Sequence, residues 1–113
     1  MLSKIYRFHS RGGVRHTYKN GNTIRHPKIS LVYSKSTRGK QRFAVVVSKK
    51  VLKSAVGRNR IRRRIYESIR LELPNLKTPM DCIFTVYNRE VKDIEFAEMQ
   101  QHISNLLKQA NLK

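Results

Sequence analysis

The sequence predicts an α+β fold, a two-layer sandwich in which helices pack on a mixed sheet of four strands or fewer. Three short apolar runs, at residues 28–34, 42–48 and 82–87, have the length and composition of strands. Between the second and third runs, isoleucines recur every four residues, and a longer amphipathic pattern fills residues 93–110. The order helix–strand–strand–helix–strand–helix therefore indicates an α+β or split βαβ sandwich.

The 113 residues are expected to form one domain, residues 1–113, with a modest single core. Residues 1–9 are expected to be a loosely held N-terminal arm, attached to the core by Ile5, Tyr6 and Phe8. Ser10 is placed to cap a helix that runs to about Asn20, where an Asn-Gly turn signal follows. On this helix Val14 and Tyr18 are four residues apart and share a face.

The three predicted strands differ in their patterns. In residues 28–34 large apolar side chains alternate with other residues, whereas 42–48 is apolar on both faces and is expected to be central in the sheet. The polar residues 35–41 contain one glycine and predict a hairpin loop between these strands. After residues 82–87, Asp93 is a good N-cap for the last helix. The apolar residues of that helix predict packing on the sheet: Phe96, Met99, Ile103, Leu106, Leu107 and Ala110.

The net charge of +18 is distributed unevenly along the chain. Residues 1–66 contain 19 Lys and Arg and no acidic residue, whereas residues 67–113 contain 6 basic and 7 acidic residues. A half-molecule without anions repels itself, so a polyanionic partner is expected, and nucleic acid is the obvious class. An anionic membrane is the rival, but no apolar run of about eighteen residues could span a bilayer, and we expect no membrane partner.

Cysteine usage and the first residues indicate the compartment. The chain starts without the apolar region of a signal peptide, and a single cysteine excludes an intramolecular disulfide framework. Because Cys82 lies inside an apolar strand pattern, we expect a buried, reduced thiol in a cytoplasmic protein.

The sequence contains no recognisable catalytic or metal site. The histidines are not spaced as a metal set, and one cysteine cannot complete a zinc site; the histidines are His9, His16, His26 and His102. Phosphate-binding loops, nucleophile elbows, HExxH pairs and paired carboxylates for nuclease metals are not evident. The polypeptide alone therefore does not look like a catalyst, and we expect it to bind no cofactor by itself.

The most informative stretch is the basic segment 48–70. Eight of the sixteen residues from Lys49 to Arg64 are Lys or Arg, and none is acidic. Ile61, Ile65 and Ile69 recur through it at helical spacing. One face of a helix is therefore expected to pack on the core while the other presents charge to solvent.

The same geometry predicts where this helix begins. Arg60, Arg63 and Arg64 fall opposite the isoleucines, whereas Arg58 projects back toward the apolar side. The helix is therefore expected to begin near Gly57–Asn59. Free backbone N–H groups of that first turn, together with the guanidinium groups, would form a local anion site.

The order and spacing of residues in this stretch resemble a known family. Similarity to the signature of the protein subunit of bacterial-type ribonuclease P is carried by Ser48-Lys49-Lys50-Val51, Ala55-Val56 and Arg58-Asn59-Arg60-Ile61-Arg62-Arg63. The remaining predicted elements agree, so the resemblance covers nearly the whole chain. Two positions depart from the family pattern, because Leu52 replaces a usual glycine and Arg64 a usual apolar residue.

The resemblance implies a role in tRNA processing. Family members assist a catalytic RNA that uses Mg²⁺ to remove the 5′ leader from precursor tRNA, and they raise its affinity for substrate and Mg²⁺. The implied fold contains a left-handed βαβ crossover, and the implied assembly is a 1:1 ribonucleoprotein with a monomeric protein. The residues implied to contact the catalytic RNA are Lys49, Lys50, Lys53, Arg58, Asn59, Arg60, Arg62 and Arg63. Pairing of Arg58 or Arg60 with Glu67 or Glu72 is the alternative.

The resemblance also implies a cleft for the leader between the first helix and the sheet. Val14 and Tyr18 match the two helix positions that are commonly aromatic, and only Tyr18 keeps a ring for base stacking. Tyr33 or Phe43 on the sheet would supply another ring, and a plain core role for Tyr18 is the alternative. Alternative functions are a general RNA chaperone, a ribosome-associated basic protein, or a self-sufficient metal nuclease.

Overall fold

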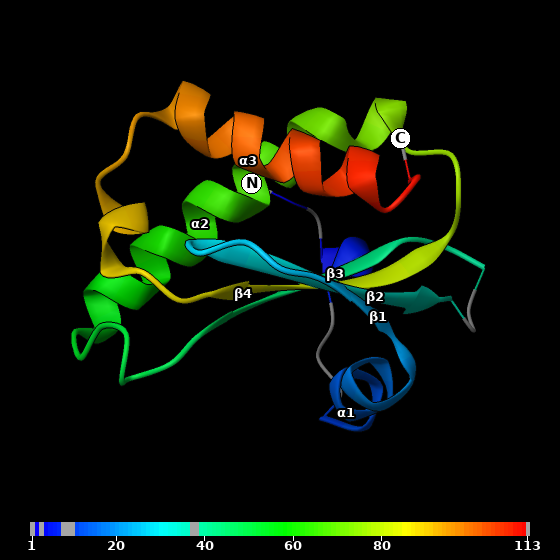
Figure 1. The fold of residues 1–113 in the computed structure, drawn as a ribbon, viewed down its shortest axis with the longest axis horizontal. Helices are drawn as coiled ribbons and strands as arrows, with labels where there is room; N and C mark the ends of the chain where they lie inside the picture. Colours follow the sequence, from blue (N-terminus) through cyan, green and yellow to red (C-terminus); the bar gives the residue numbers. More distant parts are fainter. Residues whose placement is uncertain (1, 3, 8–10, 37–38, 113) are drawn as a thin grey trace.

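A computed structural model of the chain describes residues 2, 4–7, 11–36 and 39–112. It contains a mixed four-stranded sheet, with α2 and α3 on one face and α1 on the other (Figure 1). The strands are β1 (Asn22–Ile24), β2 (Ile29–Lys35), β3 (Arg42–Val47) and β4 (Met80–Val86). The helices are α1 (Arg11–Asn20), α2 (Ala55–Glu72) and α3 (Phe96–Gln109). The predicted α+β fold around a mixed sheet is confirmed, and α1 adds a partial layer beyond the two expected.

The strand order is β1-β2-β4-β3, so β4 lies inside the sheet. It pairs antiparallel with β2 and parallel with β3. The predicted hairpin between β2 and β3 is therefore wrong, because β4 lies between them, and β3 is an edge strand rather than a central one. A parallel pair needs a crossover connection, and α2 provides it between β3 and β4. The left-handed sense of this βαβ unit, implied by the resemblance, stays a prediction.

Although β3 is at the edge, it is apolar on both faces because both faces are covered. Phe43 and Val47 belong to the core beneath α2, whereas Ala44 and Val46 belong to a small cluster on the α1 face. Arg7 forms a parallel β-bridge with Phe43 at the outer edge of the strand. The two-sided apolar pattern therefore reports coverage of both faces, and it does not specify the position of the strand in the sheet.

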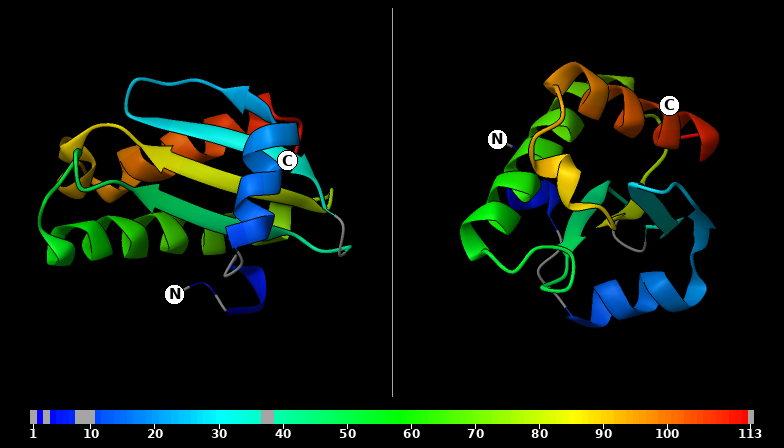
Figure 2. Two further views of the ribbon diagram at one scale, coloured as in Figure 1. Left: turned by 90° about the horizontal axis from the view of Figure 1, so that it is seen from below. Right: turned by 60° about the vertical axis from the view of Figure 1, so that its left-hand side comes forward.

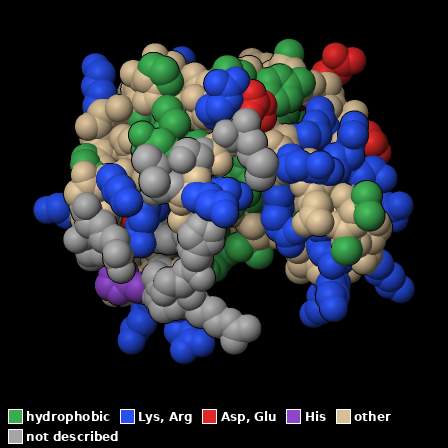
Figure 3. Space-filling view, turned by 180° about the vertical axis from the view of Figure 1, so that it is seen from behind, with side chains coloured by type: hydrophobic (Ala, Val, Ile, Leu, Met, Phe, Trp, Pro, Cys, Tyr) green, Lys and Arg blue, Asp and Glu red, His purple; other side chains and the backbone are tan. Residues whose placement is uncertain are grey.

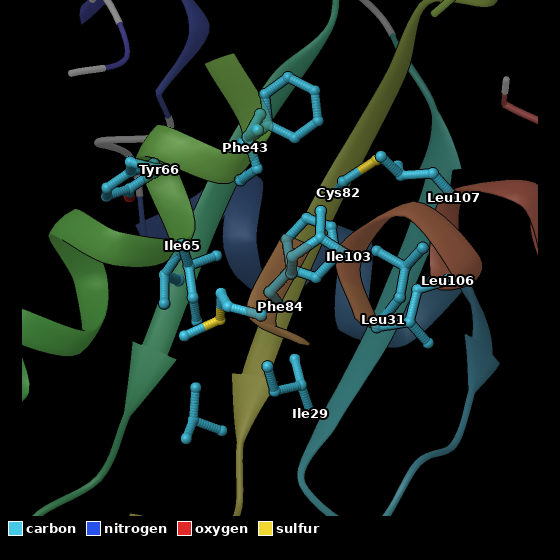
Figure 4. Packing of buried hydrophobic residues seen from close by; sticks show 14 of the residues in the cluster. Ile29, Leu31, Phe43, Ile65, Tyr66, Cys82, Phe84, Ile103, Leu106 and Leu107 are labelled. Carbon is cyan, nitrogen blue, oxygen red and sulfur yellow. The ribbon is translucent and has the colours of Figure 1, made fainter. Parts of the chain in front are cut away.

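The main core lies between the sheet and the α2 and α3 helices (Figure 4). As predicted, the isoleucines of α2 are fully buried there: Ile61, Ile65 and Ile69. Nearly all of the predicted apolar residues of α3 are buried in the same core: Met99, Ile103, Leu106, Leu107 and Ala110. Cys82 is buried in the same core, and burial raises the pKa of its thiol, which keeps the sulfur protonated and unreactive.

Much less apolar surface is buried on the α1 face of the sheet. Its cluster consists of Val32, Ala44 and Ile83, with Val14 and Val46 packed against it. At one end of this face Arg42 donates two hydrogen bonds, of 3.0 and 2.9 Å, to the buried carboxylate of Asp81. Figure 2 shows α1 crossing only part of the strands. None of the helices in the described residues covers the remainder of this face.

α1 is joined to the sheet through Gly21 and β1, a strand that the sequence did not predict. β1 has only three residues, which is too short for an alternating pattern to be recognised. A Cβ on Gly21 would lie 2.7 Å from the carbonyl oxygen of Tyr33 and still closer to that of Thr17. Glycine therefore permits the close approach that holds the end of α1 against β2.

The last helix begins later than predicted. Asp93 is not its N-cap, because the backbone N–H of Asp93 donates to the carbonyl of Glu90 at 2.9 Å and closes a short 3₁₀ turn, η3 (Arg89–Lys92). α3 starts at Phe96, and the N–H of Met99 bonds the carbonyl of Glu95 at 3.0 Å. The η3 turn brings the carbonyls of residues 91–94 against α2, where they meet arginine side chains described below.

The described part of the predicted N-terminal arm contacts the core. Leu2 is buried within the main core, and Tyr6 packs against it. Tyr6 is the last residue of a 3₁₀ turn, η1 (Lys4–Tyr6). Phe8, expected to attach the arm, and Ser10, expected to cap α1, lie outside the described residues, as does the side chain of Ile5.

Candidate nucleic-acid interface

The basic surface is built on the start of α2 and on the loop before it. Ser54 caps the helix, because its Oγ accepts a hydrogen bond from the N–H of Gly57 at 3.1 Å. The helix therefore begins at Ala55, and the predicted start near Gly57–Asn59 is wrong. The N–H of Arg58 bonds the carbonyl of Ser54 at 3.0 Å, so the first turn offers no free N–H at Arg58 for the predicted anion site.

Arg58 organises the loop that carries the exposed lysines. Its side chain is half-buried, on the apolar side as predicted, and its Nη1 donates to the carbonyls of Leu52 and Lys53 at 2.9 and 2.7 Å. Leu52, at the position where the family has glycine, covers Gly57: a Cβ there would lie 2.6 Å from the Leu52 side chain. The exposed side chains presented by this loop are Lys49, Lys50 and Lys53.

Arg64 is not on the open charged face, contrary to the prediction. Its guanidinium donates to the carbonyls of Val91 and Lys92 at 2.9 and 2.7 Å, and also to that of Ile94. Burial, followed by the charge of Arg60, lowers its pKa. Arg60 is exposed and makes a longer 3.3 Å bond to the same Lys92 carbonyl. Arg64 therefore fixes the η3 segment to α2, as an apolar residue would by packing.

The structure does not show the alternative in which Arg58 or Arg60 pairs with a carboxylate. Their hydrogen bonds are to backbone carbonyls. Glu67 instead pairs with Arg70, one turn further along α2, and this bond lowers the pKa of Glu67 to about 2. The cations at the start of α2 thus keep their charge available to an external anion.

A shallow groove of about 410 Å³ lies along the exposed side of α2. Its lining residues are Arg7, Val56, Asn59, Arg62, Arg63 and Tyr66. Arg62 donates to the side-chain oxygen of Asn59 at 2.6 Å, which holds these two predicted residues together. Arg7 stacks over the ring of Tyr66 at 5.8 Å. Sequence reasoning missed Arg7, because its place beside α2 depends on the β-bridge to Phe43.

The predicted leader-cleft residues are divided between the two faces of the sheet. Val14 and Tyr18 lie between α1 and the sheet, as expected, and the Tyr18 hydroxyl is 2.9 Å from Thr85 Oγ1. Tyr18 is 44% exposed, so it is not a plain core residue. Its ring is held at one end and remains accessible to a base.

Tyr33 and Phe43 do not lie in this cleft. Phe43 is fully buried and Tyr33 packs against the same main core, both on the α2 and α3 face. Side chains alternate along a strand, so neither can reach the α1 face without a change of register. The exposed ring that the sequence analysis missed is Tyr87, which directly follows β4 and is 51% exposed.

Positively charged side chains dominate the surface around the start of α2. Seen from behind in Figure 3, Lys and Arg side chains are spread over the visible face and gather on its right-hand side, around the end where α2 begins. Within the described residues, none of the helices has the length and apolar character needed to cross a bilayer. The same residues contain no group of three or more His, Cys, Asp or Glu side chains placed to hold a metal ion.

Solved structures share this fold. The RNase P protein of Staphylococcus aureus matches with a TM-score of 0.82 over 95% of this chain and 96% of its own, at 24% identity. The RNase P protein of Thermotoga maritima matches with a TM-score of 0.81 over 91% and 96%, at 20% identity. At these identities the likeness establishes the fold.

Sequence comparisons establish the family. The Ribonuclease P protein component of Chloroflexus aurantiacus is 37% identical over 111 residues, covering 98% of this chain and 82% of its own. That of Clostridium botulinum is 40% identical over 103 residues, covering 87% of each chain. A family model described as Ribonuclease P matches residues 2–111. These matches show that the chain belongs to the ribonuclease P protein family.

Proposed function

We propose that this chain is the protein subunit of ribonuclease P, a ribonucleoprotein endoribonuclease that removes the 5′ leader from precursor tRNA. In this proposal the RNA subunit performs the hydrolysis with Mg²⁺, and one protein binds one RNA in the cytoplasm. The α2 surface contacts the catalytic RNA, and the cleft beside α1 holds the leader. The protein therefore acts by binding and positioning, without a catalytic side chain of its own.

The observation that carries the proposal is the basic surface at the start of α2. The sequence contains no acidic residue before Glu67, and the cations there are held by backbone carbonyls or exposed to solvent. Such charges release counterions when they meet phosphates. Reduced repulsion between RNA strands then lets Mg²⁺ bind more tightly where the strands converge.

The proposal is tested by reconstitution with a bacterial-type catalytic RNA at limiting Mg²⁺. We expect 5′-end maturation of precursor tRNA to be much faster with the protein than with RNA alone, and absent with protein alone. Cleavage by the protein alone would indicate a metal nuclease. Equal affinity for unrelated RNAs, with no effect on maturation, would indicate a general RNA chaperone.

Arg60→Ala and Arg70→Ala form a matched pair for the α2 surface. Both arginines are exposed on the same helix, but Arg70 pairs with Glu67 near the opposite end. We expect Arg60→Ala to weaken assembly with the RNA and to reduce the salt slope of binding by about one. Arg70→Ala should leave both unchanged. Unaltered assembly of Arg60→Ala at near-physiological salt would contradict the assignment of this surface.

A further inference from the structure

The η3 turn lies against the start of α2, and none of the residues predicted to contact RNA belongs to it. We propose that η3 is a further part of the RNA-binding surface, in which Lys92 binds a phosphate of the catalytic RNA and Arg64 is the positioning residue that holds the turn in place. This inference rests on the proposed function and extends the basic surface of α2 to a segment after β4.

The backbone bonds of η3 leave a group of carbonyls without a backbone donor. Asn88 caps the turn, because its Oδ1 accepts from the N–H of Glu90 at 2.8 Å. The N–H groups of Asp93 and Ile94 both donate to the carbonyl of Glu90, at 2.9 and 3.1 Å. Within the described residues, the carbonyls at positions 91, 92 and 94 accept only from arginine side chains. A half-buried carbonyl that loses its donor costs free energy, so the turn depends on those side chains.

Arg64 is the main donor to these carbonyls. Its guanidinium reaches all three of them, at 2.9 Å for Val91 and 2.7 Å for Lys92. A planar group with five N–H donors can bridge several acceptors at once, which the compact ammonium of a lysine does not reproduce. Val91 is itself fully buried in the main core. Its side chain and Arg64 therefore hold the turn at two points.

Arg64 also leaves Arg60 exposed. The two arginines are one turn apart on α2, and both donate to the Lys92 carbonyl, Arg64 at 2.7 Å and Arg60 at 3.3 Å. Burial, followed by the positive charge of Arg60, lowers the pKa of Arg64, whereas Asp93 acts in the opposite direction. Because Arg64 makes the shorter bonds and its like charge repels Arg60, the Arg60 side chain stays in solvent. Arg64 thus acts on RNA binding through Arg60 and through the position of Lys92.

The Lys92 side chain lies over the first turn of α2. A Cβ placed on Gly57 would be 3.6 Å from Lys92 Cδ, so the aliphatic part of the side chain passes across this glycine. Leu52 covers the same glycine, so the Lys92 ammonium lies close to the loop that carries exposed Lys53. Among the described residues, no carboxylate lies within ion-pair distance of Lys92. Its charge is therefore available to an external anion.

The surroundings of Lys92 identify this anion as a phosphate of the RNA that α2 binds. Lys and Arg side chains gather at this end of the molecule (Figure 3), and the sequence has no acidic residue before Glu67. Several closely placed cations favour a polymer with closely spaced phosphates over an isolated anion. Because Arg60 contacts the Lys92 carbonyl, a strand that meets Arg60 passes beside Lys92. The two cations are therefore expected to contact neighbouring phosphates of one strand.

The first test measures the affinity of the protein for the catalytic RNA at several salt concentrations. Lys92→Ala should weaken binding and lower the salt slope by about one, because one phosphate contact is lost. Lys108→Ala is the matched control, since it removes the same charge from an exposed position in the last turn of α3. We expect Lys108→Ala to leave the slope unchanged.

The second test separates positioning from charge at residue 64. Arg64→Met keeps a long side chain but removes the donors, and we expect amide exchange of Asp93 and Ile94 to become about tenfold faster. RNA affinity should fall several-fold, and it should fall less in the Lys92→Ala background, because Arg64 acts partly through Lys92. Arg64→Lys keeps the charge and should restore neither slow exchange nor full affinity.

The results that overturn the inference differ from those that overturn the proposed function. If Lys92→Ala keeps the affinity and salt slope of the unaltered protein while Arg60→Ala weakens binding, Lys92 is not part of the surface. Full recovery of affinity by Arg64→Lys, or equal effects of Arg64→Met with and without Lys92, would show that Arg64 does not act by positioning η3. If the unaltered protein fails to bind the catalytic RNA, the proposed function itself fails, and the inference fails with it. Circular dichroism of each variant verifies that it is folded.

Discussion

On one face of the sheet, α2 and α3 bury the side chains of three strands in a continuous core. On the other face, α1 covers a cluster of only three buried residues: Val32, Ala44 and Ile83. Neighbouring residues of β4 belong to different faces, since Phe84 lies in the main core while Thr85 contacts Tyr18 beneath α1. One strand thus contributes to the main core on one side and to the open surface beside α1 on the other.

The comparison shows how a small chain can combine rigidity with an open surface. Tyr18 on α1 and Tyr87 at the end of β4 both remain accessible, and accessible rings contribute little to a core. The opposite face compensates for this, because its apolar residues are fully buried. The basic surface of α2 also benefits, since the isoleucines on the inner side of the helix hold its arginines at fixed positions.

The largest expected effect is a difference in how much a core truncation on each face of the sheet lowers the free energy of unfolding. Phe84→Ala should lower the free energy of unfolding by about 3–5 kcal/mol, because it removes a fully buried ring from the main core. Val46→Ala, on the half-buried α1 face, should cost about 1 kcal/mol. Chemical denaturation followed by circular dichroism measures both. Equal losses would show that the α1 face is as tightly packed as the core.

The next effect distinguishes an arginine that stabilises the loop before α2 from one that is only exposed on the surface. Arg58→Ala should destabilise the protein by about 1–3 kcal/mol, because the carbonyls of Leu52 and Lys53 lose their donor. Arg63→Ala should change stability by less than about 0.5 kcal/mol, since Arg63 is exposed. Both should weaken binding to the catalytic RNA, measured by filter binding.

Arg58→Lys is the control for this pair. It keeps the positive charge but cannot reproduce the two-carbonyl contact of the planar guanidinium. Full recovery of stability by Arg58→Lys would show that charge, and not the contact to the loop, is what Arg58 contributes.

The elements that the sequence predicted correctly depend on local patterns. The Ile61, Ile65 and Ile69 stripe identified the buried face of α2, and the apolar spacing of α3 identified its core face. The bodies of β2, β3 and β4 were also recognised from composition, whereas β1 was not. Strand order was not, because the parallel pairing of β3 with β4 joins residues far apart in the chain and leaves no local signal.

The positions of side chains were predicted correctly where helical spacing decides them. Val14 and Tyr18 were expected to share one face of the first helix, and both face the sheet. Tyr33 and Phe43 were misplaced because their face depends on strand register, which the sequence pattern left open. Arg64 was misplaced because its acceptors belong to a turn 27–30 residues further along the chain.

A third prediction concerns an aromatic ring introduced on the α1 face of the sheet. Val14→Phe places an aromatic side chain beside Tyr18, at a helix position that is half-buried against the small cluster. We expect leader-dependent affinity to rise by a few-fold, toward the lower end of the range for one stacked base. Affinity for leaderless tRNA should not change. Tyr18→Ala in the same background should remove the gain if both rings act on the leader together, and retention of the gain would separate them.

The smallest expected effect is a pH dependence at the edge of the core. His102 on α3 contacts His26, and burial, followed by the charges of His26 and Lys28, lowers its pKa, with Glu98 acting in the opposite direction. Its Nε2 is buried without a hydrogen-bond partner among the described residues. A histidine whose pKa is lower when folded binds fewer protons in the folded state, so stability increases with pH.

The stabilisation from neutral His102 should therefore be complete above the unfolded pKa of about 6.5 and should decline as the pH falls below it. Denaturation at pH 7.5 and 5.5 measures the difference. His102→Gln should reduce the loss at pH 5.5, whereas His16→Gln, at an exposed position on α1, should not. An identical pH dependence in both variants would place the titrating group elsewhere. A loss confined to the unaltered protein and His16→Gln would show that His102 is the group whose protonation destabilises the fold.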